Sequence, residues 1–268
     1  MTRVLSLAYL TGTPLPPPEM IALAEKLGYG AVGLRAMAAL PGGDFDPLIQ
    51  DKAMRRETIA RMKATGVGVF DVEIVRIAAD FALERFHPFL ELCGELAAKA
   101  ILVAGDDPDE GRLTASYAAF CDAAAPYGLT ADLEFMPWTK VPNARTALRI
   151  VQAAARPNGG ILVDALHAAR SATTLDDLTA IPRALLHYAQ ICDAPTPTPK
   201  TDDELMFTAR HARLLPGDGG IDLAGIFACL PSDLPVSVEI PNDVAKARLG
   251  PERWSQQALD ATKGVLGL

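Results

Sequence analysis

The stretch Gly160-Ile-Leu-Val-Asp-Ala-Leu-His167 is a short apolar run that ends in Asp164 and is followed, three residues later, by a histidine. Two other runs have the same form, Leu129-Thr-Ala-Asp-Leu-Glu134 and Pro235-Val-Ser-Val-Glu239. A buried strand has no packing use for a carboxylate at its end. Acids at converging strand ends therefore predict an oxygen-rich site for a hard divalent cation. The alternative is that each acid only caps a turn or a following helix.

A fourth run, Leu186-His-Tyr-Ala-Gln-Ile-Cys-Asp193, offers Gln190 and Asp193 at the corresponding place. Gln190 lies between apolar neighbours near the end of the run, so we expect its amide oxygen to face the same site. An amide oxygen is a weaker metal ligand than an imidazole nitrogen.

Short apolar runs alternate with helical patterns along the whole chain. The strand candidates are 4–10, 31–35, 67–75, 100–104, 129–134, 160–164, 186–193 and 235–239. The helical patterns cover 19–27, 51–65, 88–99, 112–127, 143–155, 175–181, 223–230 and the segment from Pro251 onward. Eight such units predict parallel strands with crossover helices and, at this length, a (β/α)8 TIM barrel. An open doubly wound sheet is the alternative.

In such a barrel the catalytic groups lie at the carboxyl ends of the strands and in the loops that follow. The acids at the ends of the fifth, sixth and eighth runs occupy those places, so the fold and the site support each other. The fingerprints of phosphate-binding loops are absent: neither GxxxxGK[ST] nor a GxGxxG after the first strand occurs.

Composition restricts the class of protein. The 268 residues are 50% hydrophobic and carry a net charge of −8, which predicts a single barrel domain over residues 1–268 and argues against nucleic acid as a partner. The four cysteines are far apart and show no metal-binding spacing, as in a reducing compartment. We find neither a signal segment nor an apolar run of membrane-spanning length, so we expect a cytoplasmic protein without a membrane partner.

Several other side chains are candidates for contact with a substrate. His167 follows an acid at a strand end, Trp138 lies just past Glu134 and is suited to stacking on a sugar face, and Arg213 adjoins an apolar segment that would anchor it. Arg213 belongs to a long polar stretch, 194–220, which predicts a lid or binding loop. Residues at the second and third strand ends, Arg35, Glu73 and Arg76, face either the site or its packing.

The ordered set of motifs resembles the sugar phosphate isomerase/epimerase superfamily of xylose isomerase-like TIM barrels. The matching segments are Glu134-Phe-Met-Pro-Trp138, Asp164-Ala-Leu-His167, Gln190-Ile-Cys-Asp-Ala-Pro195, Arg213-Leu-Leu-Pro-Gly-Asp-Gly219 and Glu239-Ile-Pro241. The resemblance implies a divalent metal (Mn, Mg, Co or Zn) bound by Glu134, Asp164, Gln190 and Glu239. The chain departs from many members at Gln190, where they have histidine.

The resemblance also implies an activity. In ketose epimerases of this group, the two glutamates that match Glu134 and Glu239 move a proton on either face of an enediolate. We therefore expect a metal-dependent isomerase or epimerase of a sugar or polyol, with His167, Arg213, Trp138 and Asp193 as substrate contacts. The alternatives are a dehydratase acting on an inosose or dehydroshikimate, and a sugar-binding barrel without activity. A homo-oligomer is possible.

Overall fold

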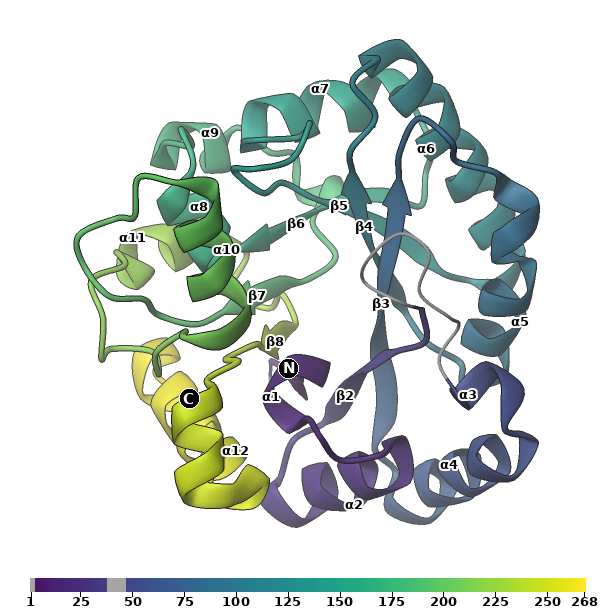
Figure 1. The fold of residues 1–268 in the computed structure, drawn as a ribbon. Coiled ribbons are helices and arrows are strands. Elements are labelled where there is room, and N and C mark those ends of the chain that lie inside the picture. Colours follow the sequence, from purple (N-terminus) through teal and green to yellow (C-terminus); the bar gives the residue numbers. More distant parts are fainter. Residues whose placement is uncertain (1–2, 38–46) are drawn as a thin grey trace.

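Eight parallel strands form a closed barrel in chain order (Figure 1). The computed structural model describes residues 3–37 and 47–268. The strands are β1 (Leu5–Leu7), β2 (Ala31–Arg35), β3 (Gly68–Ile77), β4 (Ala100–Gly105), β5 (Thr130–Glu134), β6 (Gly159–Asp164), β7 (Ala189–Ile191) and β8 (Val236–Val238). Parallel pairing of β1 with β8, in the register Ser6 to Ser237, closes the cylinder. The predicted (β/α)8 barrel is confirmed, and the open sheet is excluded.

Helices surround the barrel as an outer layer (Figure 1). They are α1 (Tyr9–Gly12), α2 (Pro17–Leu27), α3 (Pro47–Gln50), α4 (Lys52–Thr65), α5 (His87–Glu95), α6 (Glu110–Ala124), α7 (Ala144–Ala154), α8 (Ala165–Arg170), α9 (Leu175–Thr179), α10 (Asp202–His211), α11 (Leu223–Ala228) and α12 (Asp243–Leu266). Short 3-10 turns cover Leu83–Phe86, Ala125–Tyr127 and Arg183–Leu185. The last helix, α12, contacts α1 and α2, so the two ends of the chain meet beside β1 and β8.

Helix α7 shows how the outer layer forms. The Asn143 side chain caps its start by accepting the Thr146 N–H at 3.0 Å. Ile150 and Val151 lie on the buried face, where each contributes about 1.5–3 kcal/mol by leaving water. On the outer face Arg149 donates two hydrogen bonds of 2.7 Å to Glu110 of α6. The apolar stripe therefore directs the helix onto the barrel.

Two predicted segments differ from the structure. The polar stretch 194–220 contains α10, which a capping box begins: the Thr201 hydroxyl accepts the Glu204 N–H, and Glu204 accepts from Thr201. The last helix, α12, consists of two helical pieces that are separated at Gly250, which has a positive φ of 76°. The second piece corresponds to the predicted helix from Pro251 onward. The first piece, which begins at Asp243, was not predicted from the sequence.

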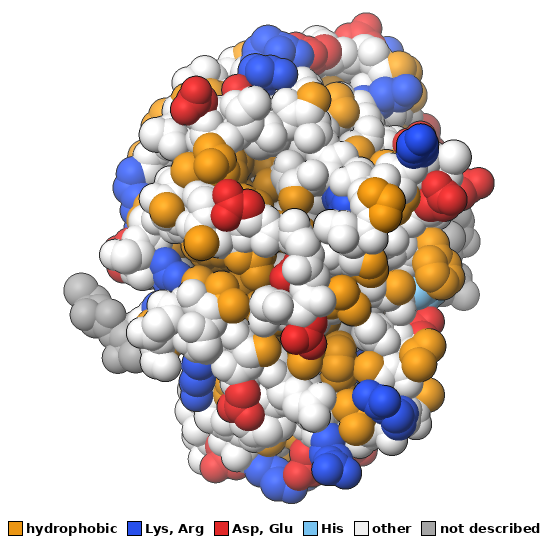
Figure 2. Space-filling view, turned by 90° about the vertical axis from the view of Figure 1, so that its left-hand side faces the viewer, with side chains coloured by type: hydrophobic (Ala, Val, Ile, Leu, Met, Phe, Trp, Pro, Cys, Tyr) orange, Lys and Arg blue, Asp and Glu red, His pale blue; other side chains and the backbone are white. Residues whose placement is uncertain are grey.

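The outer surface carries charges of both signs. Figure 2 shows acidic and basic side chains interspersed with hydrophobic ones on the face that it presents. Within residues 3–37 and 47–268, the helices are too short or too polar for any of them to span a lipid bilayer.

Tyr117 of α6 ties together the two strands that end in Glu134 and Asp164. Its hydroxyl donates to the Ala131 carbonyl of β5 at 2.7 Å and accepts the Gly160 N–H of β6 at 3.0 Å. The side chain is fully buried. The Tyr117 hydroxyl thus provides a hydrogen-bond partner for two buried backbone groups that water does not reach.

Replacing Tyr117 with Phe should lower the free energy of unfolding by about 1–3 kcal/mol, because two buried backbone groups lose a partner. Urea denaturation followed by circular dichroism measures the change. The matched control is Tyr127→Phe, since the Tyr127 side chain is exposed. Equal stability of the two variants would contradict the assigned role of the Tyr117 hydroxyl.

Candidate active site

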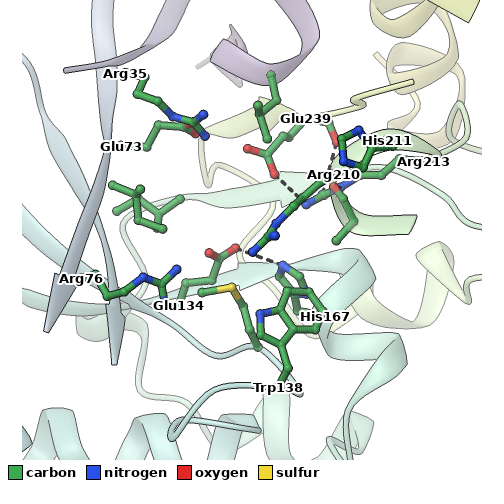
Figure 3. Close-up of a pocket in the computed structure, with 15 residues that line it drawn as sticks. Arg35, Glu73, Arg76, Glu134, Trp138, His167, Arg210, His211, Arg213 and Glu239 are labelled. Carbon is green, nitrogen blue, oxygen red and sulfur yellow. Dashed lines mark hydrogen bonds and ion pairs between the residues drawn. The ribbon is translucent and has the colours of Figure 1, made fainter. Parts of the chain in front are cut away.

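A cavity of about 250 Å³ opens at the carboxyl ends of the strands, beneath α10 (Figure 3). Its wall residues are Leu10, Arg35, Glu73, Ile74, Arg76, Leu102, Glu134, Met136, Trp138, His167, Ala209, Arg210, His211, Arg213 and Glu239. The strands contribute most of the acids, and α10 with its flanks contributes Arg210, His211 and Arg213. The mixture of charged groups and an apolar wall is typical of a small-molecule site.

Most of the residues selected from the sequence meet here. Glu134, Trp138, His167, Arg213 and Glu239 line the cavity, and Asp164 and Gln190 are fully buried behind them. Asp164 ends β6, Gln190 is the central residue of β7, and Glu239 directly follows β8.

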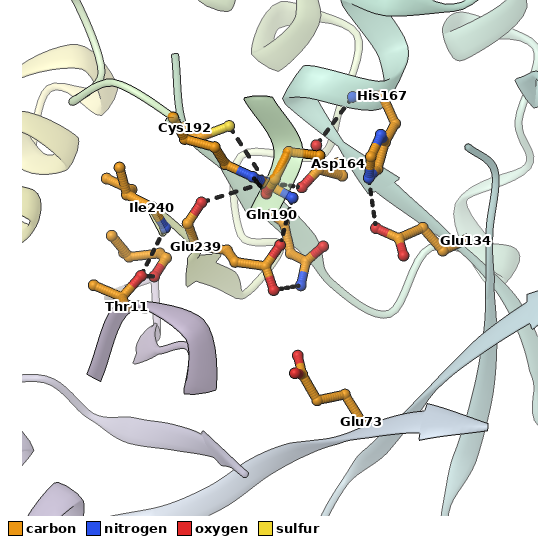
Figure 4. Close-up of polar contacts among 12 residues, drawn as sticks. Thr11, Glu73, Glu134, Asp164, His167, Gln190, Cys192, Glu239 and Ile240 are labelled. Carbon is orange, nitrogen blue, oxygen red and sulfur yellow. Dashed lines mark hydrogen bonds and ion pairs between the residues drawn. The ribbon is translucent and has the colours of Figure 1, made fainter. Parts of the chain in front are cut away.

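Arg213 holds two of the acids. One guanidinium nitrogen donates to Asp164 at 2.6 Å and the other contacts Glu239 at 2.8 Å. Its Nε donates to the Ala209 carbonyl at 2.8 Å, and the side chain is buried (Figure 4). A planar guanidinium suits such simultaneous contacts. Arg213 is therefore a structural counter-ion of the acids, a contact that its position in a polar loop did not reveal.

The opposite side of the acid group is formed by Glu134 and His167. His167 Nε2 lies 3.7 Å from a Glu134 oxygen, and the Trp138 ring meets the imidazole edge-on with centroids 5.1 Å apart. Glu134, Asp164 and His167 offer ligand atoms that all lie within 4.8 Å of one another, a group that could hold a metal ion. His167, expected to face a substrate, is thus placed among possible ligands.

Gln190 and Glu239 lie beside this group. The Gln190 amide donates to Glu239 Oε1 at 3.2 Å. Its own oxygen is buried and has no hydrogen-bond partner among the described residues. Asp164 Oδ1 accepts the His167 N–H at 3.0 Å (Figure 4), which fixes the start of α8 relative to the acid.

Charge is unbalanced among the buried groups. Three carboxylates, Glu134, Asp164 and Glu239, lie around the guanidinium of Arg213, so that with all three ionised two negative charges are in excess. A divalent cation has the charge that balances this excess, and the unpartnered Gln190 oxygen is a donor that such a cation accepts. The donor set therefore fits a divalent metal.

The pKa values follow the same imbalance. Burial, then Asp164 and Glu239, raises the pKa of Glu134 well above its usual range. Burial raises the pKa of Glu239 to about 8 although Arg213 opposes the change. Burial lowers the pKa of His167 to about 4, so its imidazole is neutral near pH 7. Asp164 differs: Arg213 and His167 outweigh burial, and the pKa of Asp164 is lowered.

The remaining walls carry ion pairs that the sequence left open. Arg35 donates to Glu73 at 2.6 Å and its guanidinium lies 4.6 Å from the Tyr9 ring centroid. Arg76 pairs with Asp106, which follows β4. Arg35 extends from β2 into the cavity, and Glu73 and Arg76 extend into it from β3. The sequence indicated that Arg35, Glu73 and Arg76 lie at or near strand ends. It did not indicate that their side chains point into the cavity.

Contacts from outside the cavity fix the position of Glu239. Thr11 donates to the Val238 carbonyl at 2.8 Å and accepts the Ile240 N–H, and Trp254 of α12 donates to the Ile240 carbonyl at 2.9 Å. Figure 4 shows Thr11 against Ile240. The residues on both sides of Glu239 are thus hydrogen-bonded, so its carboxylate has a defined place.

Asp193 is the exception among the predicted substrate contacts, because the structure places it outside the cavity lining. Its carboxylate accepts three backbone N–H groups, from Ala194 at 2.8 Å, Ile221 at 2.9 Å and Gly217 at 3.0 Å. Both carboxylate oxygens of Asp193 are therefore occupied by backbone hydrogen bonds. These bonds hold the chain after β7 against the segment before α11.

Comparison with known proteins places the chain in a family. A family model described as a xylose isomerase-like TIM barrel matches residues 21–264. The chain belongs to this family, in agreement with the closed barrel and with the resemblance of its motifs.

Curated relatives include the 3-dehydroshikimate dehydratases of Pseudomonas aeruginosa and Pseudomonas putida. The first is 25% identical over 228 residues, covering 84% of this chain and 32% of that protein. The second is 27% identical over 195 residues, covering 69% of this chain and 29% of that protein. The chain therefore spans about a third of the length of these relatives.

Among solved structures, the crystal structure of the IOLI protein with a bound zinc atom superimposes with a TM-score of 0.81. The match covers 99% of this chain and 98% of that one at 21% sequence identity. At this level of identity the likeness establishes the shared fold.

Removing the Asp193 carboxylate should destabilise the protein. Asp193→Ala leaves three backbone N–H groups without their charged acceptor, and we expect a loss of about 2–4 kcal/mol in the free energy of unfolding. Thermal and urea denaturation measure it, with the exposed Asp218→Ala as control. An Asp193→Ala variant of unchanged stability but weakened ligand binding would restore the role predicted from the sequence.

Proposed function

We propose that this chain is a divalent-metal-dependent enzyme that removes a proton next to the carbonyl group of a polyhydroxylated small molecule. The observation that carries the proposal is the buried group of Glu134, Asp164 and Glu239 around one guanidinium, with the unpartnered oxygen of Gln190 beside it. Acids in a largely enclosed site need a cation, and a glutamate without a fixed partner is free to accept a proton.

Glu134, Asp164, Gln190 and Glu239 are the residues that would hold the metal, with His167 as a neighbouring donor. The bound ion would supply positive charge next to the substrate oxygens and so make the adjacent C–H bond more acidic. With oxygen donors in the majority, the set suits Mg²⁺ or Mn²⁺, and a contribution from His167 shifts the preference towards Mn²⁺, Co²⁺ or Zn²⁺.

The two glutamates differ in freedom. Both oxygens of Glu239 are engaged, one by Gln190 and one by Arg213. The Glu134 carboxylate accepts no hydrogen bond from the described residues, its nearest partner being the imidazole of His167 at 3.7 Å. We therefore assign Glu134 as the base that takes the proton, while the bonding electrons move onto the carbonyl oxygen.

The fate of the resulting enediol-type species defines the reaction. If Glu239 delivers a proton of its own to the other face of the same carbon, the product is the epimer and Glu134 keeps the proton that it took. If Glu134 returns its proton to the neighbouring carbon, while the hydroxyl proton passes to the former carbonyl oxygen, the product is the isomer. Either outcome is favoured by the presence of glutamates on two sides of the cavity, on β5 and after β8.

Dehydration is the second candidate. In this reaction the hydroxyl group on the next carbon leaves as water after proton removal, so no proton returns to the first carbon. The names of the two Pseudomonas relatives support it, because both are dehydratases. His167 and Trp138 lie on the wall where a leaving hydroxyl and the face of a ring would meet Glu134.

Metal binding is tested by titrating chelator-treated protein with Mn²⁺, Mg²⁺ and Zn²⁺ in a calorimeter. One equivalent should bind to the wild type, and Asp164→Asn or Glu239→Gln should weaken binding at least about tenfold, since each removes a charged donor. Glu252→Gln, at an exposed site on α12, is the control. Equal metal affinity in all four proteins would contradict the proposed ligands.

Proton abstraction is tested by incubating metal-loaded protein with hydroxy-ketones, inososes and 3-dehydroshikimate in D₂O. Deuterium uptake in recovered substrate or product indicates isomerase or epimerase chemistry, whereas loss of 18 mass units with a new ultraviolet absorbance indicates a dehydratase. Glu134→Gln should slow either reaction by about 10²–10⁴-fold, the usual contribution of a general base.

Glu110→Gln, on the outer face of α6, is the control for that experiment and should react as the wild type does. Absence of both exchange and water loss across the panel, in protein shown to contain metal, would favour a sugar-binding barrel without activity.

A further inference from the structure

Four arginines line the cavity, and one of them differs from the rest. Arg35 is paired with Glu73, Arg76 with Asp106, and Arg213 with Asp164 and Glu239. Arg210 has no ion pair with any residue of the described segments. Its side chain nevertheless extends from α10 into the cavity, with the guanidinium directed towards Glu134 (Figure 3).

Arg76 approaches the same region from the opposite wall (Figure 3). It comes from β3, and its Nε is buried without a hydrogen-bond partner among the described residues. Burial lowers the pKa of Arg76, the charge of Arg210 lowers it further, and Glu134 opposes both effects. Two like charges with free donors on facing walls form a place where an anion is stabilised.

Charge balance gives the valence of that anion. Glu73 and Asp106 are neutralised by Arg35 and Arg76, and a divalent ion together with Arg213 neutralises Glu134, Asp164 and Glu239. The charge of Arg210 then remains. One negative charge on the substrate neutralises the charge of Arg210. A phosphate dianion would bring one negative charge too many, and a neutral sugar would leave the charge of Arg210 without a counter-ion.

We propose that the cavity contains an anion subsite in which Arg210, with Arg76 opposite, binds a single carboxylate of the substrate. This inference rests on the proposed function and narrows its substrates to polyhydroxylated carboxylic acids that carry a carbonyl group. The planar guanidinium of Arg210 receives the carboxylate in a two-point contact, and this contact is open to an entering ligand because Arg210 is exposed to solvent.

The test compares an acid with its neutral ester. Metal-loaded wild type is titrated calorimetrically with 3-dehydroshikimate and with quinate, each beside its methyl ester, and with a neutral inositol and a sugar phosphate. We expect at least one acid to bind about tenfold or more tightly than its ester and more tightly than the sugar phosphate. Arg210→Met should remove this preference, and Arg210→Lys should keep part of it.

Arg248→Met, which removes an exposed arginine of α12 outside the cavity lining, is the matched control and should keep the full preference. A wild type that binds no acid more tightly than its ester, including one that binds neither, overturns the subsite. So does an Arg210→Met variant with the wild-type preference, or a wild type that prefers the sugar phosphate.

A parallel metal titration separates the two proposals. Arg210→Met should bind Mn²⁺ at least as tightly as the wild type, because Arg210 contacts none of the proposed ligands and the substitution removes a like charge from the cavity. If the wild type binds no divalent ion, the proposed function fails, and the acid–ester comparison on metal-free protein still decides the subsite by the same criteria.

Discussion

The need to neutralise three carboxylates inside one end of a barrel governs the arrangement of this site. Asp164, Glu134 and Glu239 are almost completely shielded from water, where an unpaired charge costs several kcal/mol. Arg213 meets part of that need by reaching between two strand ends. The negative charge that Arg213 does not neutralise lies on the side of Glu134 and the Gln190 oxygen, next to the cavity. A ligand therefore enters the site on the side where negative charge is in excess.

The outer frame keeps these charges in place. Tyr117 links β5 to β6, Thr11 and Trp254 hold the chain on both sides of Glu239, and Asp193 fixes the loop after β7. None of these side chains lines the cavity. Their contribution is positional: an ion or a substrate meets acids whose separation has been set by the hydrogen bonds of the barrel, and this lowers the cost of ordering on binding.

Much of the fold and part of the candidate site could be predicted from the sequence, for a clear reason. In a parallel barrel every strand ends on the same side, so Glu134, Asp164 and Glu239 had to approach one another once the eight units were recognised. Asp193, predicted as a substrate contact, lies outside the cavity lining. It lies three residues beyond Gln190, and strand side chains alternate, so an odd step does not preserve the inward direction. The partner of Arg213 could not be predicted, since no local spacing encodes a contact across 49 residues.

Helix α10 was missed for a different reason, although its capping box was present in the sequence. Its polar composition resembled a loop, and its few buried positions, Leu205 and Ala209, give a weak apolar period. The segment before α10, residues 194–201, is correctly predicted to be non-helical, because its proline residues exclude a regular helix.

That helix has a consequence for how such a protein changes during evolution. Isolated bridges attach the chain on either side of α10, Asp193 to Leu214 and Ala212 to Asn242, and the helix caps itself. The acids lie on or next to the barrel strands, whereas Arg210 and His211 belong to α10. Mutations in the ten residues of α10 can therefore alter which compounds are accepted while the reactive groups are inherited unchanged. Descendants of one barrel can then diverge in substrate before they diverge in reaction.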